Sequence, residues 1–301
     1  MTQKVLAIVG ATASGKTGLA VELAKSIGGL EAINADSRQV YRYMDIGTAK
    51  PTSGEREALP HWLVDVVYPD QQFNLGRWLE LAKEGLETIW GRGLIPVIVG
   101  GTGQYVWALL EGWRVPQVPS QEELRREMES RPPDDLLSEL LHIDPASEEY
   151  IQPSNVRRVI RALEVYHATG KPFTYWRTKD APDFDAMVVG LHLTRDALYK
   201  RIDQRVDMMM RAGFLGEVRG LVERGYGCDL PAMSAMGYRE LCEHLHGELT
   251  LEEAVERTKT GTHRLARHQN AWFKASDRRI HWLESDRAVD GGIELVREWL
   301  A

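Results

Sequence analysis

Short apolar runs alternate with longer amphipathic segments along most of the chain. Buried strands are predicted at Val5–Val9, Glu31–Ala35, Leu63–Val67, Ile95–Val99 and Ala186–Leu193. Amphipathic helices are predicted from Lys16 to Ile27, from Asn74 to Trp90 and from about Gln104. Strands that alternate with helices in this way favour an α/β fold built on a parallel sheet.

A different pattern begins at Trp113, where the long apolar runs stop. Two short charged helices separated by Pro132-Pro133, and a further helix capped by Asn155, are predicted in this region. This change of pattern indicates a helical insertion into the sheet domain. We therefore expect a core domain of residues 1–113 and 181–301 and a mainly helical insertion domain of residues 114–180.

The composition is that of an ordinary globular protein, with 43% hydrophobic and 27% charged residues among 301. Neither a signal peptide nor an apolar run of membrane-spanning length is present, so we expect no membrane association. The two cysteines, Cys228 and Cys242, have no metal-like spacing, which favours a reducing cytoplasm and makes a structural zinc site unlikely.

The strongest chemical signal is the loop that follows the first strand. Residues Gly10 to Thr17 fit the pattern Gly, four residues, Gly-Lys-Ser/Thr. In such a loop the backbone amides converge on phosphate oxygens, and Gly15 lets the backbone approach closely. Lys16 adds a positive charge and the Thr17 hydroxyl suits Mg²⁺. The pattern predicts a P-loop NTPase-like core that binds a phosphate compound.

Two further strand ends bear on the reaction. Asp36 follows the second strand, where it is a candidate catalytic carboxylate or, equally well, a cap of the next turn. The strand that ends at Val99 continues into Gly100-Gly101, without the acidic residue that NTPases use to hold Mg²⁺ through water. That absence favours transfer of a group over nucleotide hydrolysis.

Basic residues concentrate in two segments of a chain whose net charge is −7. Residues 157–179 hold six Lys/Arg and one Glu, and residues 257–279 hold seven Lys/Arg and one Asp. The second segment lies in a long helix predicted from Thr250 to about Lys274, whose apolar face is predicted to contain Leu251, Val255, Leu265 and Trp272. We expect these two basic segments to form a polyanion site rather than solvated helix faces.

Taken together, the motifs resemble those of the tRNA dimethylallyltransferases, and of their bacterial members in particular. The resemblance rests on Gly10–Thr17, Asn34–Tyr41, Ile46–Pro51 and Val99–Gly103, and it continues through Asn155–Pro172, Arg201–Met208, Ala235–Glu240 and Thr262–Phe273. It implies transfer of a dimethylallyl group from dimethylallyl diphosphate to N6 of the adenosine 3′-adjacent to the anticodon of tRNA, with release of diphosphate and with Mg²⁺ as cofactor. A monomer is expected.

The resemblance also implies roles for particular residues. Diphosphate would be bound by Gly10, Thr12, Ala13, Ser14, Gly15, Lys16, Thr17 and Arg201, with Thr17 on the metal. Catalysis would depend on Asp36 as general base and on Lys16, Thr17 and Arg205, with Arg201 as the alternative arginine facing the leaving group. The tRNA would contact Asp36, Ser37, Arg38, Gln39, Thr102, Arg157, Arg158, Arg161, Arg264 and Arg267.

Three other functions remain compatible with parts of the sequence. A small-molecule or nucleoside kinase would share the loop, Mg²⁺ and a carboxylate base, but it would not explain the two basic segments. An adenylate prenyltransferase would prefer a free nucleotide to tRNA. A non-catalytic RNA-binding module would have no need for Lys16, Thr17 and Asp36.

Overall fold

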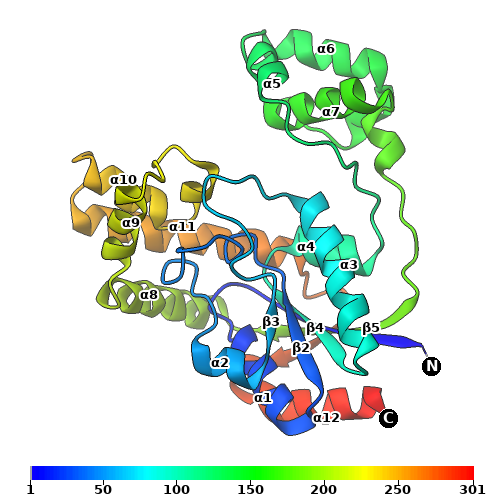
Figure 1. Cartoon of the computed structure of the whole chain (residues 1–301), viewed down its shortest axis with the longest axis vertical. Coiled ribbons are helices and arrows are strands. Elements are labelled where there is room, and N and C mark those ends of the chain that lie inside the picture. The colour runs from blue at the N-terminus through cyan, green and yellow to red at the C-terminus, as the bar shows by residue number, and fades with distance from the viewer. Residues whose placement is uncertain (1) are drawn as a thin grey trace. The chain divides into compact units, whose positions relative to one another are not determined.

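Six parallel strands form the centre of the structure, a computed structural model that describes residues 2–301 (Figure 1). The strands are β1 (Gln3–Val9), β2 (Leu30–Asn34), β3 (His61–Trp62), β4 (Ile95–Gly100), β5 (Phe184–His192) and β6 (Ile280–Glu284). Their order in the sheet is β3-β2-β4-β1-β5-β6. Every neighbouring pair is parallel, so the carboxyl ends of all six strands lie at one edge.

Twelve α-helices and four 3₁₀ helices connect and cover the strands within residues 2–301. The α-helices are α1 (Lys16–Ile27), α2 (Ser53–Ala58), α3 (Leu75–Gly91), α4 (Gly103–Leu110), α5 (Glu122–Glu129), α6 (Pro133–Ile143), α7 (Val156–Thr169), α8 (Arg195–Arg211), α9 (Phe214–Glu223), α10 (Tyr238–Leu245), α11 (Leu251–Trp272) and α12 (Ala288–Leu300). The 3₁₀ helices are η1 (Pro145–Glu149), η2 (Phe173–Trp176), η3 (Pro231–Ser234) and η4 (Ser285–Arg287). None of these helices is both long and apolar enough to cross a membrane.

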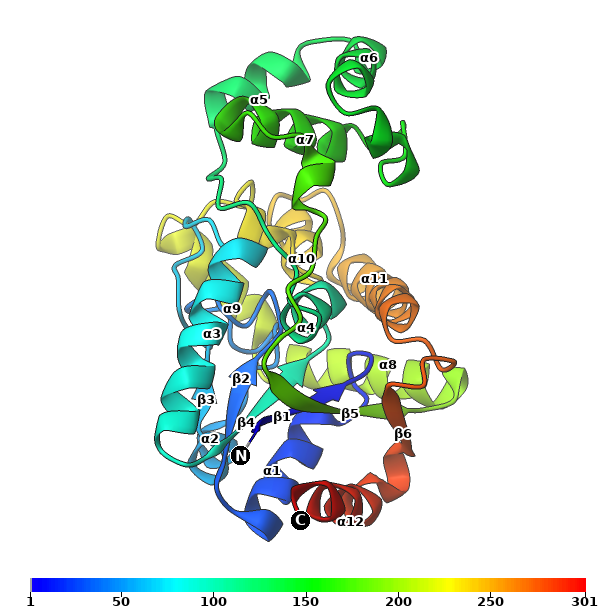
Figure 2. The ribbon, with the colours of Figure 1, turned by 90° about the vertical axis from the view of Figure 1, so that its right-hand side faces the viewer.

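Both faces of the sheet are covered, as its nearly continuous apolar strands require. Helices α1 and α12 pack together on one face, where Leu19 and Leu23 meet Val296 over the strands (Figure 2). Helices α3 and α4 cover the other face. There Trp78 stacks on Tyr105 and donates a hydrogen bond from its indole nitrogen to the Asn34 carbonyl oxygen at 2.8 Å.

The chain divides into two compact units, residues 1–110 with 183–301 and residues 111–182. The first contains the whole sheet, and the second contains α5, α6 and α7 with η1 and η2. The sequence pattern predicts these boundaries at 113/114 and 180/181.

A separate helical cluster within the first unit packs beside the sheet edge. Its buried side chains come from α9, α10, the start of α11 and the segment that follows β2, and they include Val40, Phe214 and Tyr238. Cys228 and Cys242 form a disulfide in this cluster. The expectation of a reducing compartment did not anticipate that pairing.

The strand predicted at Leu63–Val67 is wrong in position. The edge strand β3 contains only His61 and Trp62, which pair with β2. Leu63 and Asp65 then adopt left-handed backbone angles, with φ of 63° and 59°, and such residues cannot continue a strand. This turn brings the Asp65 carboxylate to Arg56, with Nη1 of Arg56 at 3.2 Å.

The apolar face predicted for the last long helix is wrong in part: Leu251 packs against a buried cluster as expected, but Leu265 does not. Helix α11 ends at Trp272, and its buried positions are Ala254, Thr258, Ala266 and Gln269. Leu265, placed on the apolar face from the sequence, is 38% exposed. Small residues form the buried side because α8 and α10 pack closely against this helix.

Strand β6 and helix α12 were not anticipated from the sequence. Their segment is rich in charged residues, which conceals the few apolar positions that pack on the sheet. Ile280 on β6 and Val296 on α12 are both buried, and β6 pairs with β5 from Val188 to His192. The sheet therefore has one more strand at this edge than the periodicity predicts.

The second unit has a small apolar core between α5, α6 and α7, which includes Leu136, Leu140 and Leu163. Glu164 lies at its margin and is fully buried. Its carboxylate accepts hydrogen bonds from Nε and Nη2 of Arg125, both at 2.9 Å, from the Gln121 amide at 2.7 Å, and from Arg161. Burial raises the pKa of Glu164, but these bonds outweigh it and the net pKa is lowered.

We expect Glu164→Ala to lower the free energy of unfolding by roughly 3 kcal/mol, because it leaves two arginines without their carboxylate. The loss is measured by urea denaturation at pH 7, with Glu149→Ala, an exposed change in the same unit, as control. Since the pKa is lowered on folding, the stabilisation by Glu164 is present above the unfolded pKa and is lost as pH falls below it. Equal stability of the two variants would contradict this assignment.

Candidate active site

The loop after β1 is built to surround an anion. The chain turns through Gly10, Ala13 and Gly15 with φ of 145°, 62° and 100°, values that L side chains rarely adopt. A Cβ at Gly10 would lie 3.0 Å from the Leu191 carbonyl oxygen, so only glycine fits there. Helix α1 begins at Lys16 without a side-chain cap, which leaves its first amides open to a ligand.

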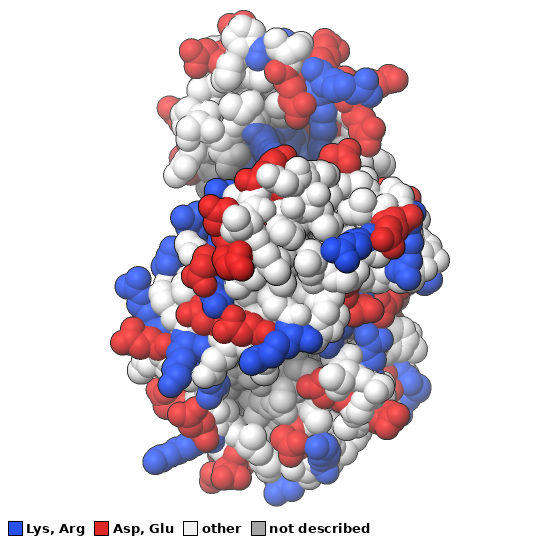
Figure 3. All heavy atoms as spheres, turned by 90° about the vertical axis from the view of Figure 1, so that its left-hand side faces the viewer, with Lys and Arg blue, Asp and Glu red and all other residues white. Residues whose placement is uncertain are grey.

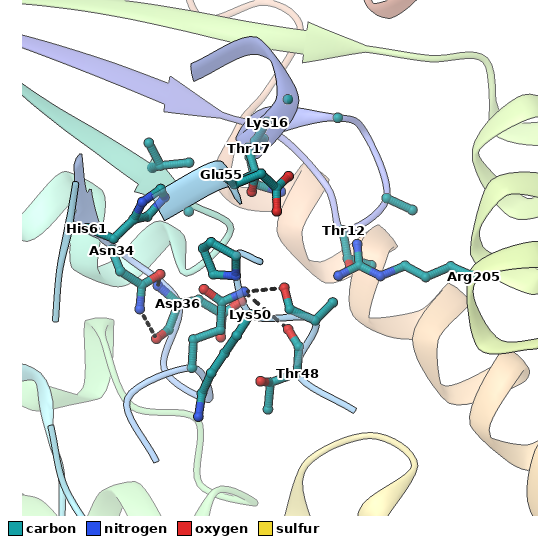
Figure 4. A pocket seen from close by; sticks show the side chains of 18 of the residues that line it. Thr12, Lys16, Thr17, Asn34, Asp36, Thr48, Lys50, Glu55, His61 and Arg205 are labelled. Atoms are coloured by element: carbon teal, nitrogen blue, oxygen red, sulfur yellow. Dashed lines mark hydrogen bonds between the residues drawn. The ribbon is translucent and has the colours of Figure 1, made fainter. Parts of the chain in front are cut away.

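A pocket of about 300 Å³ lies over this loop at the carboxyl edge of the sheet. Its walls contain Thr12, Ala13, Gly15, Lys16, Thr17, Gly18, Asn34, Asp36, Gln39, Thr48, Ala49, Lys50, Pro51, Glu55, His61, Val99, Gly100, Arg205 and Gln269. Figure 4 shows Arg205 reaching in from α8 toward Thr12, with the Glu55 carboxylate beside Thr17. The loop, Asp36 and Arg205, predicted from separate motifs, therefore meet in one cavity.

Lys16 lies at the floor of this pocket. Its Nζ donates a hydrogen bond to the Ala11 carbonyl oxygen at 2.8 Å. The pKa of Lys16 is lowered to about 8, chiefly by burial and also by nearby Arg205, while Asp36 partly offsets both effects. Lys16 and Arg205 line the same pocket as the carboxylates of Asp36 and Glu55, and burial that disfavours both cations favours a bound anion.

The structure separates the two candidate arginines. Arg205 lines the pocket, and burial lowers its pKa while Asp36 and Glu55 partly restore it. Arg201, one turn earlier on α8, donates from Nη1 to Ser285 Oγ at 2.9 Å and from Nη2 to Asp286 at 2.8 Å. Ser285 in turn donates to the Ser14 carbonyl oxygen at 2.7 Å. Arg201 thus supports the phosphate loop from behind, whereas Arg205 faces the cavity.

Asp36 is placed for both of the roles that the sequence left open, a cap of the next turn and a carboxylate at the site. Its Oδ1 accepts a hydrogen bond from the Arg38 amide at 2.8 Å, which caps the turn after β2. The residue also lines the pocket, and no hydrogen bond to its Oδ2 is formed within residues 2–301. One oxygen holds the turn while the other is available to a ligand.

Steric contacts explain the missing carboxylate after β4. A Cβ at Gly100 would lie 2.2 Å from the Ala35 carbonyl oxygen, and one at Gly101 would lie 2.3 Å from Nε2 of Gln269. At Gly100 the clash is with backbone, so no side chain fits there, whereas at Gly101 a side chain would fit only if that of Gln269 moved. The acidic residue of an NTPase is therefore excluded by the packing of β2 against β4.

The predicted tRNA contacts near Asp36 are arranged around its turn. The Ser37 amide donates to Thr102 Oγ1 at 3.1 Å, and Arg38 donates to the Pro231 carbonyl oxygen at 3.0 Å and to Ser234 Oγ at 3.1 Å. Of Ser37, Arg38, Gln39 and Thr102, only Gln39 is among the pocket walls. Ser37, Arg38 and Thr102 instead stabilise the turn that contains Asp36.

The three predicted RNA-binding arginines of α7 do not share one environment. Arg157 and Arg158 are exposed. Arg161 bonds Glu164 and donates from Nη2 to the Val118 carbonyl oxygen at 2.9 Å. Arg161 therefore stabilises the helical unit itself, a role that the spacing of the arginines in the sequence does not indicate.

The basic segment of α11 is partly neutralised by neighbouring helices. Arg257 faces Glu243 of α10 at 3.4 Å, and Lys259 faces Asp207 of α8 at 2.8 Å. Arg264 and Arg267 are exposed, and Arg267 donates to the Tyr199 hydroxyl at 2.7 Å. On the face drawn in Figure 3, basic and acidic side chains are interspersed and form no uniformly basic surface.

Several pocket residues were not singled out from the sequence. They are Asn34, Thr48, Lys50, Glu55, His61 and Gln269. Gln269 reaches the loop from α11, where its Oε1 accepts from the Thr12 amide at 2.7 Å. Asn34 lies in the Asn34–Tyr41 motif, Thr48 and Lys50 in Ile46–Pro51, and Gln269 in Thr262–Phe273, so the motifs were the available signal for these four.

A magnesium ion fits the donors that this pocket provides. No group of three or more His, Cys, Asp or Glu side chains within residues 2–301 could form a protein-only metal site. Mg²⁺ usually keeps several waters and binds through one or two protein oxygens and substrate phosphates. The Thr17 hydroxyl and the Glu55 carboxylate line the same pocket and would supply such oxygens (Figure 4).

Comparison with known proteins agrees with this geometry. A family profile described as IPP transferase matches residues 39–276, and one described as Isopentenyl transferase matches residues 3–65. The chain belongs to the IPP transferase family. It is 48% identical to a tRNA dimethylallyltransferase of Roseiflexus sp. (strain RS-1), over 98% of both chains, and 43% identical to that of Dehalococcoides mccartyi, over 98% of this chain and 92% of the relative.

Solved structures of family members have the same fold. The full-length tRNA isopentenylpyrophosphate transferase of Bacillus halodurans is 38% identical, with a TM-score of 0.72 over 99% of this chain and 95% of that one. A eukaryotic dimethylallyltransferase acting on tRNA is 30% identical, with a TM-score of 0.85 over 98% of this chain and 78% of that one. The P-loop NTPase-like fold predicted from the sequence is confirmed.

The lowered pKa of Lys16 predicts a pH-dependent affinity for a phosphate ligand, with inorganic diphosphate as the probe. Lys16 loses its proton as pH rises through about 8, and the bound diphosphate favours the charged form. The affinity should therefore fall above pH 8, approaching about tenfold per pH unit. Calorimetric titration without RNA, from pH 7 to 10, measures this fall.

Lys16→Arg is the matched control, because a guanidinium stays charged throughout this range. Its affinity at pH 7 is expected to be weaker but nearly independent of pH. A wild-type affinity that stays constant to pH 10 would rule out Lys16 as the titrating contact.

Proposed function

We propose that this IPP transferase moves a dimethylallyl group from dimethylallyl diphosphate to N6 of the adenosine 3′-adjacent to the anticodon of tRNA, releasing diphosphate. One observation carries the proposal: Asp36 lies in the same pocket as the phosphate loop and Arg205. A base and an anion site within about 300 Å³ suit a nucleophile that attacks a carbon bearing diphosphate.

The departing diphosphate is the group that the pocket must stabilise. When the allylic C–O bond breaks, its electron pair goes to the diphosphate oxygen and leaves positive charge on the allyl group. The phosphate loop, Lys16 and Arg205 line one pocket and would supply positive charge where the negative charge develops. Mg²⁺ on Thr17 would neutralise further charge on the phosphate oxygens.

The nucleophile needs a proton acceptor because the adenine amino group is a weak base. As N6 forms its bond to carbon, one of its protons becomes acidic and passes to Oδ2 of Asp36. A positioned base of this kind contributes roughly 10²–10⁴-fold to the rate. The target base must first leave its stack, which costs a few kcal/mol and less in a loop than in a duplex.

Two alternatives are less well supported by the site. An NTP-dependent kinase usually holds Mg²⁺ with a carboxylate at the end of the β4 equivalent, and the contacts of Gly100 exclude any side chain there. A prenyltransferase for free nucleotides would not need the exposed Arg157, Arg158 and Arg264.

Two further properties follow from this proposal. We propose that the enzyme works as a monomer. Because the proposed substrate is tRNA, we propose the cytoplasm as the compartment in which the enzyme works.

Transfer of label tests the function directly. The protein is incubated with Mg²⁺, radiolabelled dimethylallyl diphosphate and an anticodon stem-loop RNA that carries adenosine at the target position. Label is expected on N6 of that adenosine and not on free AMP. Label on AMP alone would favour the free-nucleotide alternative, and phosphate transfer from ATP would favour the kinase.

Replacing the proposed base separates catalysis from binding. Asp36→Asn retains an oxygen that can accept from the Arg38 amide, so the turn should persist. We expect kcat to fall by roughly 10²–10⁴-fold while the affinities for RNA and for dimethylallyl diphosphate stay near wild type. Single-turnover kinetics measure the rate, with the exposed Asp70→Asn as control. Near-normal turnover in Asp36→Asn would show that another group accepts the proton.

A further inference from the structure

Glu217, on α9, bonds the backbone of a segment that forms part of the pocket wall. We call residues 45–49 the pocket loop, since Thr48 and Ala49 line the cavity. The Glu217 carboxylate accepts three amides of this loop, those of Asp45 at 2.8 Å, Ile46 at 2.7 Å and Gly47 at 3.1 Å. Three convergent amides on one carboxylate give charge-assisted hydrogen bonds, which are stronger than neutral ones.

The pocket loop is held by packing as well. The Tyr238 hydroxyl donates to Oε1 of Glu217 at 2.6 Å, which orients the carboxylate. A Cβ at Gly47 would lie 2.2 Å from the Phe214 ring and 2.5 Å from the Tyr238 ring, so the loop backbone lies flat on both rings. Ala49 has φ of 48°, a strained value that persists only where the surroundings impose it.

The pocket loop in turn determines the orientation of Gln39. The side-chain nitrogen Nε2 of Gln39 donates to the carbonyl oxygens of Thr48 at 3.1 Å and Ala49 at 3.0 Å. Because both partners are acceptors, only the amide nitrogen of Gln39 can face them. Its Oε1 is left as an acceptor on a residue that lines the pocket, and no group within residues 2–301 donates to it.

We propose that Glu217 is a positioning residue which, through the pocket loop, holds the Gln39 amide with its oxygen toward the substrate base. This inference rests on the proposed function, in which that base is adenine. An acceptor at this place accepts a hydrogen bond from an exocyclic amino group, which adenine has, and repels the carbonyl oxygen of hypoxanthine. Glu217 therefore contributes to the choice of base without touching it.

The test compares RNA stem-loops with adenosine or inosine at the target position. Glu217→Gln keeps the side-chain shape but replaces one acceptor oxygen by an amino group that repels the loop amides. We expect the preference for adenosine over inosine in binding to fall about tenfold, the value of one hydrogen bond. Affinity for dimethylallyl diphosphate should not change, because the phosphate loop has no contact with Glu217. Glu223→Gln, an exposed change on the same helix, should retain the wild-type preference.

A double-mutant cycle shows whether Glu217 acts through Gln39. If it does, Glu217→Gln in a Gln39→Ala background causes no further loss of base preference. Additive losses, or an unchanged preference in Glu217→Gln, would overturn the proposal. Tyr238→Phe removes only the orienting hydroxyl and should give a smaller loss in the same direction, which provides a second variant if Glu217→Gln folds poorly.

The two proposals fail in distinguishable ways. A wild-type protein that prenylates the RNA yet binds adenosine and inosine equally would overturn the role of Glu217 and Gln39 alone. A wild-type protein that transfers no label would overturn the proposed function and, with it, the base that this inference assumes.

Discussion

The close contact of β2 and β4 at their carboxyl ends is the constraint on which the site depends. The backbone at Gly100 lies so near the Ala35 carbonyl oxygen that no Cβ fits between them. This contact brings the turn that contains Asp36 next to the phosphate loop, because β4 also pairs with β1. It excludes an acidic residue at the end of β4 for the same reason. One packing contact thus places Asp36 beside the phosphate loop and excludes the NTPase carboxylate.

Charge in the pocket is unbalanced before any ligand binds. Burial lowers the pKa of both Lys16 and Arg205, and Arg205 lowers that of Lys16 further. Asp36 partly restores both, and Glu55 partly restores that of Arg205. The fold therefore holds two cations where they are unfavourable without an anion. A diphosphate removes that cost, and the cations need little reorganisation as the leaving group gains charge. An acidic protein can bind an anion tightly because this local arrangement, not the net charge, determines the field.

Local motifs predicted the phosphate loop, Asp36 and Arg205, because each depends on short spacing or on an ordered family motif. Contacts between distant segments could not be predicted in the same way. Glu217 and Gln269 reach the site from helices far along the chain, and only the fold shows their partners. Strand β6 was not predicted, because the charged residues in its segment obscure the alternation of apolar and polar positions that indicates a strand. The strand expected at Leu63–Val67 failed because two left-handed residues interrupt an otherwise apolar run.

Helix α11 packs against the core through some of its basic residues and exposes others on the surface. In its N-terminal half, Arg257 and Lys259 pair with carboxylates on α10 and α8, so their charge holds the helix in place. Further along, Gln269 bonds the phosphate loop while Arg264 is exposed on the surface. The Arg257 side chain is still 60% exposed, so both halves of the helix present basic groups to a polyanion. Only the C-terminal half joins that surface to the phosphate loop, because Gln269 accepts a hydrogen bond from the Thr12 amide.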